Sequence, residues 1–232
     1  MIDHNDKIFH LVEVANTWQG EGPFTGRQML IARFKYCNRH CQFCDTWIKM
    51  KSTQEGSYSI NDLNKSLEKT KALMITGGEP TFNSKDKKIN NLDQTILMLK
   101  YCNYQMVNIE TNGYDLDNLC CEIQKMTSDD DIKIIYSPKI FSEEDYQIEI
   151  EKTKRMIKKP YLYIKVVVDD GEYSNKYIQE ISKLTDDKGK IYLMPLGLTI
   201  EEIAKNWDKC IDMADDLNLN ISTRMHIMNQ FT

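Results

Sequence analysis

Residues 72–80 read ALMITGGEP, and this stretch decides the fold class. The apolar run from Ala72 to Thr76 has the length and composition of a buried strand, and a Gly-Gly-Glu-Pro loop follows it at once. The same order recurs along the chain, with an apolar run, a short polar motif and then a segment of helical spacing. The motifs that follow the later runs are Glu110-Thr111-Asn112-Gly113, Ser137-Pro138-Lys139 and Met194-Pro195-Leu196-Gly197. This alternation predicts a parallel α/β sheet, and parallel strands collect such motifs at their carboxyl edge.

The strands predicted from these apolar runs number about six or seven. They span Met29–Phe34, Ala72–Thr76, Met106–Glu110, Ile132–Ser137, Tyr161–Val168, Lys190–Met194 and Asn220–Ile227. Helices are predicted near residues 60–70 and over Leu92–Tyr101, Leu116–Met126, Ser142–Ile157 and Ser174–Leu184, with the clearest one following Thr199 and Glu202, which are spaced as a capping box. Six or seven mainly parallel strands are too few for an eightfold barrel, so we expect a partial TIM-like β/α barrel. No linker or repeat divides the chain, and residues 1–232 are expected to form one domain.

Composition limits the classes of partner. The chain has 232 residues, of which 41% are hydrophobic and 28% charged, and these proportions are typical of a globular protein. Its net charge of −5 disfavours nucleic acid and acidic membrane surfaces as partners. The first ten residues carry no secretory signal pattern and no apolar run is long enough to span a membrane, so we expect a cytoplasmic protein.

Three of the seven cysteines lie within eight residues, as Cys37, Cys41 and Cys44 in the segment YCNRHCQFCDTW. Three thiolates on a tight loop can hold three corners of an iron–sulfur cube and leave one iron open. A structural zinc site is the alternative and needs a fourth ligand, for which His40, His226, His10 and His4 are the candidates. The other four cysteines, Cys102, Cys120, Cys121 and Cys210, are expected to be core thiols in helices.

The Gly-Gly-Glu-Pro loop suits a small zwitterion. Gly77 and Gly78 leave backbone amides and carbonyls approachable, and the Glu79 carboxylate can accept a charge-assisted hydrogen bond from an ammonium group. Alone, the same four residues would be read as a tight turn. The conjunction of this loop with the cysteine cluster favours a binding site.

The cysteine loop and the Gly77–Pro80 loop together resemble the radical S-adenosylmethionine (SAM) superfamily. Further motifs, in order along nearly the whole chain, make it similar to the 7-carboxy-7-deazaguanine synthase family: Gln19-Gly20-Glu21-Gly22, Cys44-Asp45-Thr46, Glu110-Thr111-Asn112-Gly113, Ser137-Pro138-Lys139, Lys165-Val166-Val167 and His226. The resemblance implies a radical enzyme that contracts the ring of 6-carboxy-5,6,7,8-tetrahydropterin, releases ammonia and serves queuosine-type deazapurine synthesis.

The resemblance also implies the cofactors and their residues. A 4Fe-4S cluster would be ligated by Cys37, Cys41 and Cys44, and its open iron would chelate SAM, which is cleaved reductively to a 5′-deoxyadenosyl radical. The residues that would border SAM are Phe43, Asp45, Gly78, Glu79, Ser137, Pro138 and Lys139. Mg²⁺ would bind the hydroxyl of Thr46, which would otherwise be read as a helix N-cap. The family also implies a flavodoxin- or ferredoxin-type one-electron reductant and a homodimer.

For the pterin, the resemblance implies a set of binding residues drawn from several motifs. They are Trp18, Gln19, Gly20, Glu21, Arg33, Thr76, Glu110, His226 and the C-terminal Thr232. Arg33 suits a carboxylate because its guanidinium is a fixed fork of donors, although an ordinary ion pair is the other explanation for an arginine at a strand end. The chain departs from the family at Trp18, at Leu196 and in residues 222–226, which lack the usual proline.

Two other functions share some of these motifs. An activase that takes a hydrogen atom from a glycine of a partner protein would use the cluster and the glycine loop, but would not need Gln19, Glu21 and His226. A zinc-stapled binding module would need only the cysteines and a histidine.

Overall fold

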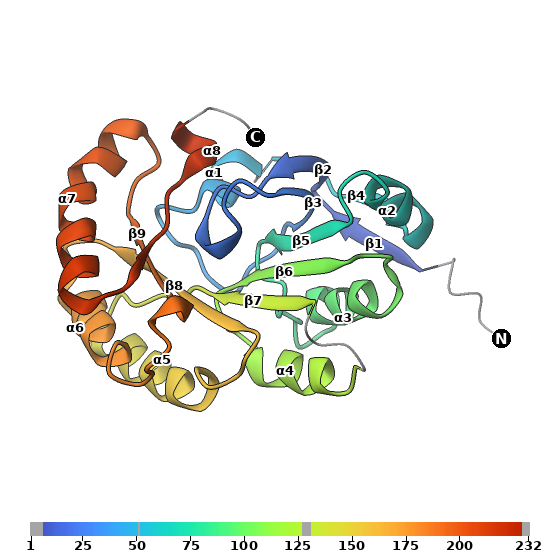
Figure 1. The fold of residues 1–232 in the computed structure, drawn as a ribbon. Helices are drawn as coiled ribbons and strands as arrows, with labels where there is room; N and C mark the ends of the chain where they lie inside the picture. Colours follow the sequence, from blue (N-terminus) through green and yellow to red (C-terminus); the bar gives the residue numbers. More distant parts are fainter. Residues whose placement is uncertain (1–6, 51, 127–130, 229–232) are drawn as a thin grey trace. The chain divides into compact units, whose positions relative to one another are not determined.

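A computed structural model describes residues 7–50, 52–126 and 131–228, arranged in two compact units. Unit 1 comprises Met1–Thr17 and Gln28–Ile134, and unit 2 comprises Trp18–Arg27 and Ile135–Thr232. Figure 1 labels the helices α1 to α8 and the strands β1 to β9. In the described part of the chain, no helix is both long enough and apolar enough to cross a membrane.

Unit 1 is built on strands in the order β2-β3-β5-β6-β7. Their bounds are β2 (Glu13–Trp18), β3 (Gln28–Phe34), β5 (Ala72–Gly77), β6 (Met106–Thr111) and β7 (Ile132–Tyr136), and the unit boundary falls within β7. The β3–β5 and β5–β6 pairs are parallel, with Arg33 opposite Thr76. Leu73, Ile75 and Val107 are fully buried, as expected for strands of a parallel sheet.

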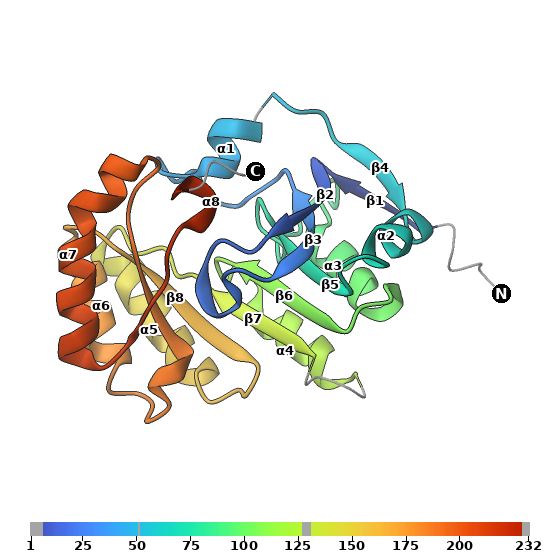
Figure 2. The same cartoon turned by 45° about the horizontal axis from the view of Figure 1, so that its top comes forward.

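The remaining elements of unit 1 follow or flank these strands. They are the helices α1 (Asp45–Met50), α2 (Ile60–Leu67), α3 (Asn91–Tyr101) and α4 (Leu116–Gln124), and a separate antiparallel pair formed by β1 (Ile8–Leu11) and β4 (Gly56–Ser59). Figure 2 shows β1 and β4 side by side, with α2 directly after β4. The sequence did not predict this small sheet.

Unit 2 continues the strand–helix alternation in the order β7-β8-β9-β10. Its elements are η2 (Gly22–Phe24), α5 (Glu143–Met156), β8 (Leu162–Val168), α6 (Glu172–Ile181), η3 (Lys188–Lys190), β9 (Ile191–Pro195), α7 (Ile200–Leu217), β10 (Asn220–Ile221) and α8 (Met225–Met228). The β8–β9 and β9–β10 pairs are parallel. The partial TIM-like β/α barrel expected from the sequence is confirmed. Its sheet has eight strands in the described part of the chain, where six or seven were expected, because β2 was not predicted.

The C-terminal strand prediction is wrong in most of its length. Only Asn220 and Ile221 are extended, and His226 lies in the short helix α8 instead of a strand. After β10, the Ser222 amide still donates to Leu193 O at 2.7 Å, but the Arg224 side chain turns to Glu21 and the chain coils into α8. The alternation of apolar and polar residues over 221–227 therefore reflects the tertiary contacts of this segment and not the hydrogen-bond ladder of a long strand.

Two smaller predictions also change. Cys121 is exposed, whereas Cys102, Cys120 and Cys210 are buried as expected, with Cys102 just after α3. The capping box of α7 forms only in half, because Thr199 Oγ1 accepts from Glu202 N while the Glu202 carboxylate accepts from Leu198 N.

Candidate functional site

The cysteine loop of unit 1 leaves the end of β3 and leads into α1. Cys37, Cys41 and Cys44 are all half-buried and form no disulfide, and the amide of Cys44 donates to Cys41 O at 3.1 Å to close the loop. Backbone amides also point at sulfur: Arg39 N lies 3.4 Å from Cys37 Sγ, and Trp47 N lies 3.3 Å from Cys44 Sγ. Donors around sulfur are what a bound thiolate requires, because they stabilise its negative charge.

Burial shapes the electrostatics of this loop. Loss of solvent raises the pKa of the Cys37 thiol to about 11, the backbone hydrogen bond from Arg39 acts in the opposite direction, and the negative charges of Glu79 and the neighbouring cysteines raise the pKa further. A positively charged group of iron ions would offset this cost and hold the thiolate ionised.

The donor set fits an iron–sulfur cube. Among the described residues, no group of three or more Cys, His, Asp or Glu side chains is arranged to hold one metal ion. A cubane does not need such a group, because each thiolate binds a different iron. His40, the zinc candidate inside the loop, is exposed and packs edge-on against Trp47 with ring centres 5.2 Å apart. His10 lies in β1, where its backbone amide donates to Gln94 Oε1 of α3. His4 lies outside the described residues.

The glycine loop is attached directly to the strand end that carries the cysteines. Gly78 N donates to Phe34 O and Glu79 N donates to Tyr36 O, both at 2.7 Å, so the β3–β5 ladder continues past both strands. A Cβ atom on Gly78 would lie 2.0 Å from Tyr36 O, and Gly77 adopts φ +101° with a Cβ position that collides with Phe34. Only glycine at both positions permits this close approach.

Glu79 has a different immediate role from the one expected. Its side chain is buried, with Oε1 accepting from Thr81 N at 2.8 Å and from the hydroxyls of Thr81 and Thr111, and Oε2 accepting from Asn112 N at 2.6 Å. Burial raises the pKa of Glu79, and these hydrogen bonds partly offset the rise. The carboxylate thus joins the glycine loop to the loop after β6, and its contact with SAM stays a prediction.

Thr46 and Arg33 lie together in unit 1. Arg33 Nη1 donates to Thr46 Oγ1 at 3.0 Å, and Arg33 Nε pairs with Glu13 at 2.6 Å. Thr46 lies in the first turn of α1 and donates its amide to Asp45 Oδ1, so it is not the N-cap residue. The structure therefore gives Arg33 an ion pair, and leaves part of its donor fork for another acceptor.

The other unit 1 residues expected to bind ligands lie at strand ends or in the cysteine loop. Thr76 is the next-to-last residue of β5, and Glu110 is near the end of β6. Glu110 Oε1 accepts a hydrogen bond from the side-chain amide of Asn108 at 3.1 Å. Phe43 lies between Cys41 and Cys44 and is half-buried. These positions match the expected carboxyl edge of the parallel strands.

Unit 2 contains a charged site made of Glu21, Lys165, Arg224 and His226. Lys165 Nζ lies 2.6 Å from Glu21 Oε2, Arg224 Nε lies 3.0 Å from Glu21 Oε1, and His226 Nε2 lies 3.7 Å from Glu21 Oε1. The Lys165 and Arg224 side chains are only 5% and 7% exposed, so their ion pairs with Glu21 are largely shielded from water.

The loop that carries Glu21 is fastened to the segment before α8. Gly20 O accepts from Met225 N at 2.9 Å, and Gly22 N donates to Ser222 Oγ at 2.7 Å. A Cβ atom on Gly20 would lie 2.3 Å from His226 Nδ1, so glycine is required for this approach. His226 is thereby brought beside Glu21, and the substrate-binding role of both residues stays a prediction.

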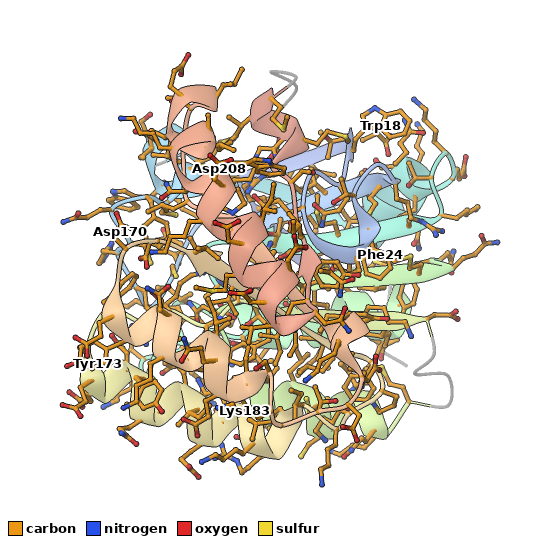
Figure 3. The ribbon with its side chains drawn as sticks, turned by 60° about the vertical axis from the view of Figure 1, so that its left-hand side comes forward. Trp18, Phe24, Asp170, Tyr173, Lys183 and Asp208 are labelled. Atoms are coloured by element: carbon orange, nitrogen blue, oxygen red, sulfur yellow. The ribbon has the colours of Figure 1, made fainter. Side chains whose placement is uncertain are left out.

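The neighbouring residues of this loop differ in exposure. Gln19 is buried, and its Oε1 accepts from Glu21 N at 3.1 Å. Trp18, labelled in Figure 3, is 48% exposed, and Phe24 packs edge-on against Tyr163 of β8.

The Ser137-Pro138-Lys139 motif directly follows β7, as predicted. Ser137 and Pro138 are buried, and Lys139 Nζ donates to Ser137 Oγ at 3.0 Å. Thr232, the remaining predicted substrate residue, lies outside the described residues.

Sequence reasoning did not assign three residues that these sites use, namely Lys165, Arg224 and Asn112. A signal existed for Lys165, because a lysine within the apolar strand Leu162–Val168 needs a buried counter-charge. Asn112 lies in the Glu110–Gly113 motif that the sequence singled out, but nothing distinguished it from its neighbours there. Arg224 had no comparable signal, since arginine in a loop is common at surfaces.

Comparisons with known proteins agree with the family resemblance found in the sequence. The model of the radical SAM superfamily matches residues 31–229. A 7-carboxy-7-deazaguanine synthase of Hyperthermus butylicus is 24% identical over 96% of this chain and 93% of its own length. One from Bacteroides thetaiotaomicron is 31% identical over 53% of this chain and 68% of its own. The crystal structure of QueE from Escherichia coli, 21% identical, covers 94% of this chain and 95% of its own with a TM-score of 0.58, which shows the shared fold.

Proposed function

The chain belongs to the radical SAM superfamily and, within it, to the family of 7-carboxy-7-deazaguanine synthases, and we propose that it converts 6-carboxy-5,6,7,8-tetrahydropterin to 7-carboxy-7-deazaguanine with loss of ammonia. Membership implies a 4Fe-4S cluster, SAM, a small-molecule substrate and an electron donor. When bound, the cluster and SAM supply hydrogen-atom abstraction, and the protein binds, orients and shields the reactants.

One observation carries this proposal: the continued ladder between the cysteine loop and the glycine loop. Because Gly78 N and Glu79 N bond to Phe34 O and Tyr36 O, the cysteines and the glycine loop keep a fixed distance from each other. SAM would bind an iron through its amino-acid end and contact the backbone of the glycine loop at the same time. Such binding needs a fixed distance between the two loops.

We assign each residue the role that the resemblance implies. The cluster is assigned to Cys37, Cys41 and Cys44, and SAM to Phe43, Asp45, Gly78, Glu79, Ser137, Pro138 and Lys139. The pterin is assigned to Trp18, Gln19, Gly20, Glu21, Arg33, Thr76, Glu110, His226 and Thr232. The guanidinium of Arg33 suits a carboxylate, and the charged site suits a donor-rich ring.

Anaerobic reconstitution tests the assignment. The expected holoprotein carries about four irons per chain and, with SAM and a reductant, forms 7-carboxy-7-deazaguanine from the pterin. Glu21→Gln should lose pterin turnover while it retains the cluster and SAM binding, because only the charged site is changed. A fully loaded protein that forms no product would contradict the substrate assignment, and an iron-free protein would contradict the cofactor assignment.

We also assign Mg²⁺ to Thr46. Thr46 Oγ1 accepts one hydrogen bond from Arg33 and keeps one lone pair, which is enough for an ion that otherwise binds water and substrate oxygens. Thr46→Val preserves the shape of the side chain and removes this oxygen. The variant should lose the magnesium-dependent part of turnover with unchanged iron content, and equal magnesium dependence in both proteins would remove Thr46 from the site.

Three features of the whole protein complete the proposal. We infer a cytoplasmic enzyme, since a reducing compartment keeps the three cluster thiols available. We infer a homodimer, which light scattering coupled to size exclusion tests against the monomer mass of 27.2 kDa. We infer a flavodoxin- or ferredoxin-type reductant, which should support turnover without a chemical reductant.

A further inference from the structure

Asn112 connects the two loops of unit 1 that hold the cofactors. It follows β6 directly and is 9% exposed, and its backbone amide donates to Glu79 Oε2 at 2.6 Å. The backbone of Asn112 is therefore fixed relative to the glycine loop. Its side chain points the other way, toward the cysteine loop.

Both side-chain contacts of Asn112 are made by its amide nitrogen. Asn112 Nδ2 lies 2.9 Å from Asn38 Oδ1 and 3.5 Å from Cys37 Sγ. The NH₂ group has two hydrogens, and each has an acceptor, because an iron-bound thiolate and an amide oxygen can only accept. Asn38 thus orients the amide, and the second N–H is aimed at sulfur.

We propose that Asn112 is a positioning residue that raises the reduction potential of the cluster through its hydrogen bond to Cys37 Sγ. The reduced cluster holds one more electron, which is shared with its thiolates. An N–H donor stabilises that added charge more than the charge of the oxidised cluster. The effect is strengthened by burial, since Cys37 Sγ is poorly solvated.

Arg39 N already donates to Cys37 Sγ, so Asn112 is the second donor on this sulfur. The inference rests on the proposed function only in requiring the cluster.

The test measures the midpoint potential of the reconstituted holoenzyme by redox titration, followed by the electron paramagnetic resonance (EPR) signal of the reduced cluster. Asn112→Ala should shift the potential to a more negative value, and Asn112→Asp should shift it further, because a carboxylate replaces the donor. Asn38→Ala, which leaves the N–H in place but frees its orientation, should give a smaller shift in the same direction.

Thr81→Val is the matched control. It removes one hydrogen bond to Glu79 Oε1 from the same loop system but leaves the donor on sulfur, so its potential should equal that of the wild type. A shift as large in Thr81→Val as in Asn112→Ala would show that loop anchoring, and not the sulfur contact, sets the potential. Equal potentials in the wild type and Asn112→Ala, both with full iron, would overturn the inference and leave the proposed function intact.

If the Asn112 variants lose iron, the wild type decides the question. Pulsed EPR of reduced holoenzyme labelled with ¹⁵N only in asparagine side-chain amides should detect a nitrogen coupled to the cluster. No such coupling would overturn the inference, whereas an iron-free wild type would contradict the proposed function itself.

Discussion

Lys165 and Arg224 show how single residues stabilise the charged site of unit 2. Both cations are nearly buried and share the Glu21 carboxylate, one on each oxygen. Removing one partner of a buried ion pair costs about 3–5 kcal/mol, because the other charge stays buried. We expect Glu21→Gln to lower the free energy of unfolding more than Lys165→Met, since the first leaves two cations without this carboxylate and the second leaves Glu21 paired with Arg224.

Urea denaturation of the metal-free protein measures this difference, with Lys183→Met on the surface of unit 2 as the control. Lys183 is exposed, as Figure 3 shows, and should change stability little. Equal losses for Glu21→Gln and Lys165→Met would mean that Arg224 does not compensate for Lys165. A small loss for both would mean that the site is solvated.

Residue patterns indicate the cysteine loop more directly than the charged site. The three cysteines stand out in the sequence because their spacing is short and few other patterns share their chemistry. In the charged site, Lys165 lies 144 positions from Glu21 in sequence and Arg224 lies 203 positions from it. No local sequence pattern indicates such a pairing. Arg33 was predicted correctly as a residue at a strand end, but its contact with Thr46 depends on how α1 follows the cysteine loop.

At the scale of elements, helix α2 predicts a pH dependence. Its capping box pairs Ser59 with Asp62, and hydrogen bonds from the side chain and backbone of Ser59 lower the pKa of Asp62. A lowered pKa in the folded protein means that the stabilisation is complete above the unfolded pKa of about 3.9 and is lost as pH falls through the folded value. Asp62→Asn should therefore be less stable than the wild type at pH 7, with the difference shrinking toward pH 3.

Thermal unfolding followed by circular dichroism at several pH values checks this expectation. Asp93→Asn in the first turn of α3 is the control, because Asp93 lies at a similar position in a helix whose N-cap side chain makes no capping hydrogen bond. A difference between Asp62→Asn and the wild type that stays constant from pH 7 to pH 3 would contradict the capping role of the carboxylate.

Helix α7 gives a second prediction at this scale. Thr199 Oγ1 accepts from Glu202 N, and loss of an N-cap side chain costs about 1 kcal/mol. Thr199→Ala should lower the urea midpoint, and Thr199→Ser, which keeps the hydroxyl, should not. Equal midpoints for the alanine and serine variants would show that the hydroxyl does not cap the helix.

Periodicity identified long elements and missed short ones for a physical reason. The apolar strands β3, β5, β6, β7, β8 and β9 were recognised because both faces are buried and the run is continuous. Strands β1 and β4 have four residues each, which is too short for a pattern, and their pairing depends on contacts more than forty positions apart in sequence. The opposite error occurs at residues 220–227. Their alternation of apolar and polar residues predicts a long strand, but the segment ends in helix α8.

At the scale of the whole molecule, the connectivity of the chain favours one cooperative unfolding transition. The chain passes between the units after Thr17, after Arg27 and within β7, so neither unit is a continuous segment. Unit 2 obtains Glu21 from the N-terminal part of the sequence, and its buried Lys165 and Arg224 depend on that carboxylate. Because β7 contributes residues to both units and the chain passes between them three times, we expect both units to unfold in one transition.

Calorimetry of the metal-free chain should show a single transition, consistent with one domain over residues 1–232, and two separated transitions would contradict this. A fragment of residues 135–232 supplies the sharper comparison. It contains most of unit 2 but lacks Trp18–Arg27, so Lys165 and Arg224 lose Glu21 and the fragment should show no cooperative melting. The same fragment with Lys165→Met and Arg224→Met no longer has those two charges to bury. If cooperative melting returns in this variant, unit 2 needs the segment Trp18–Arg27 for the carboxylate of Glu21 and not for its backbone.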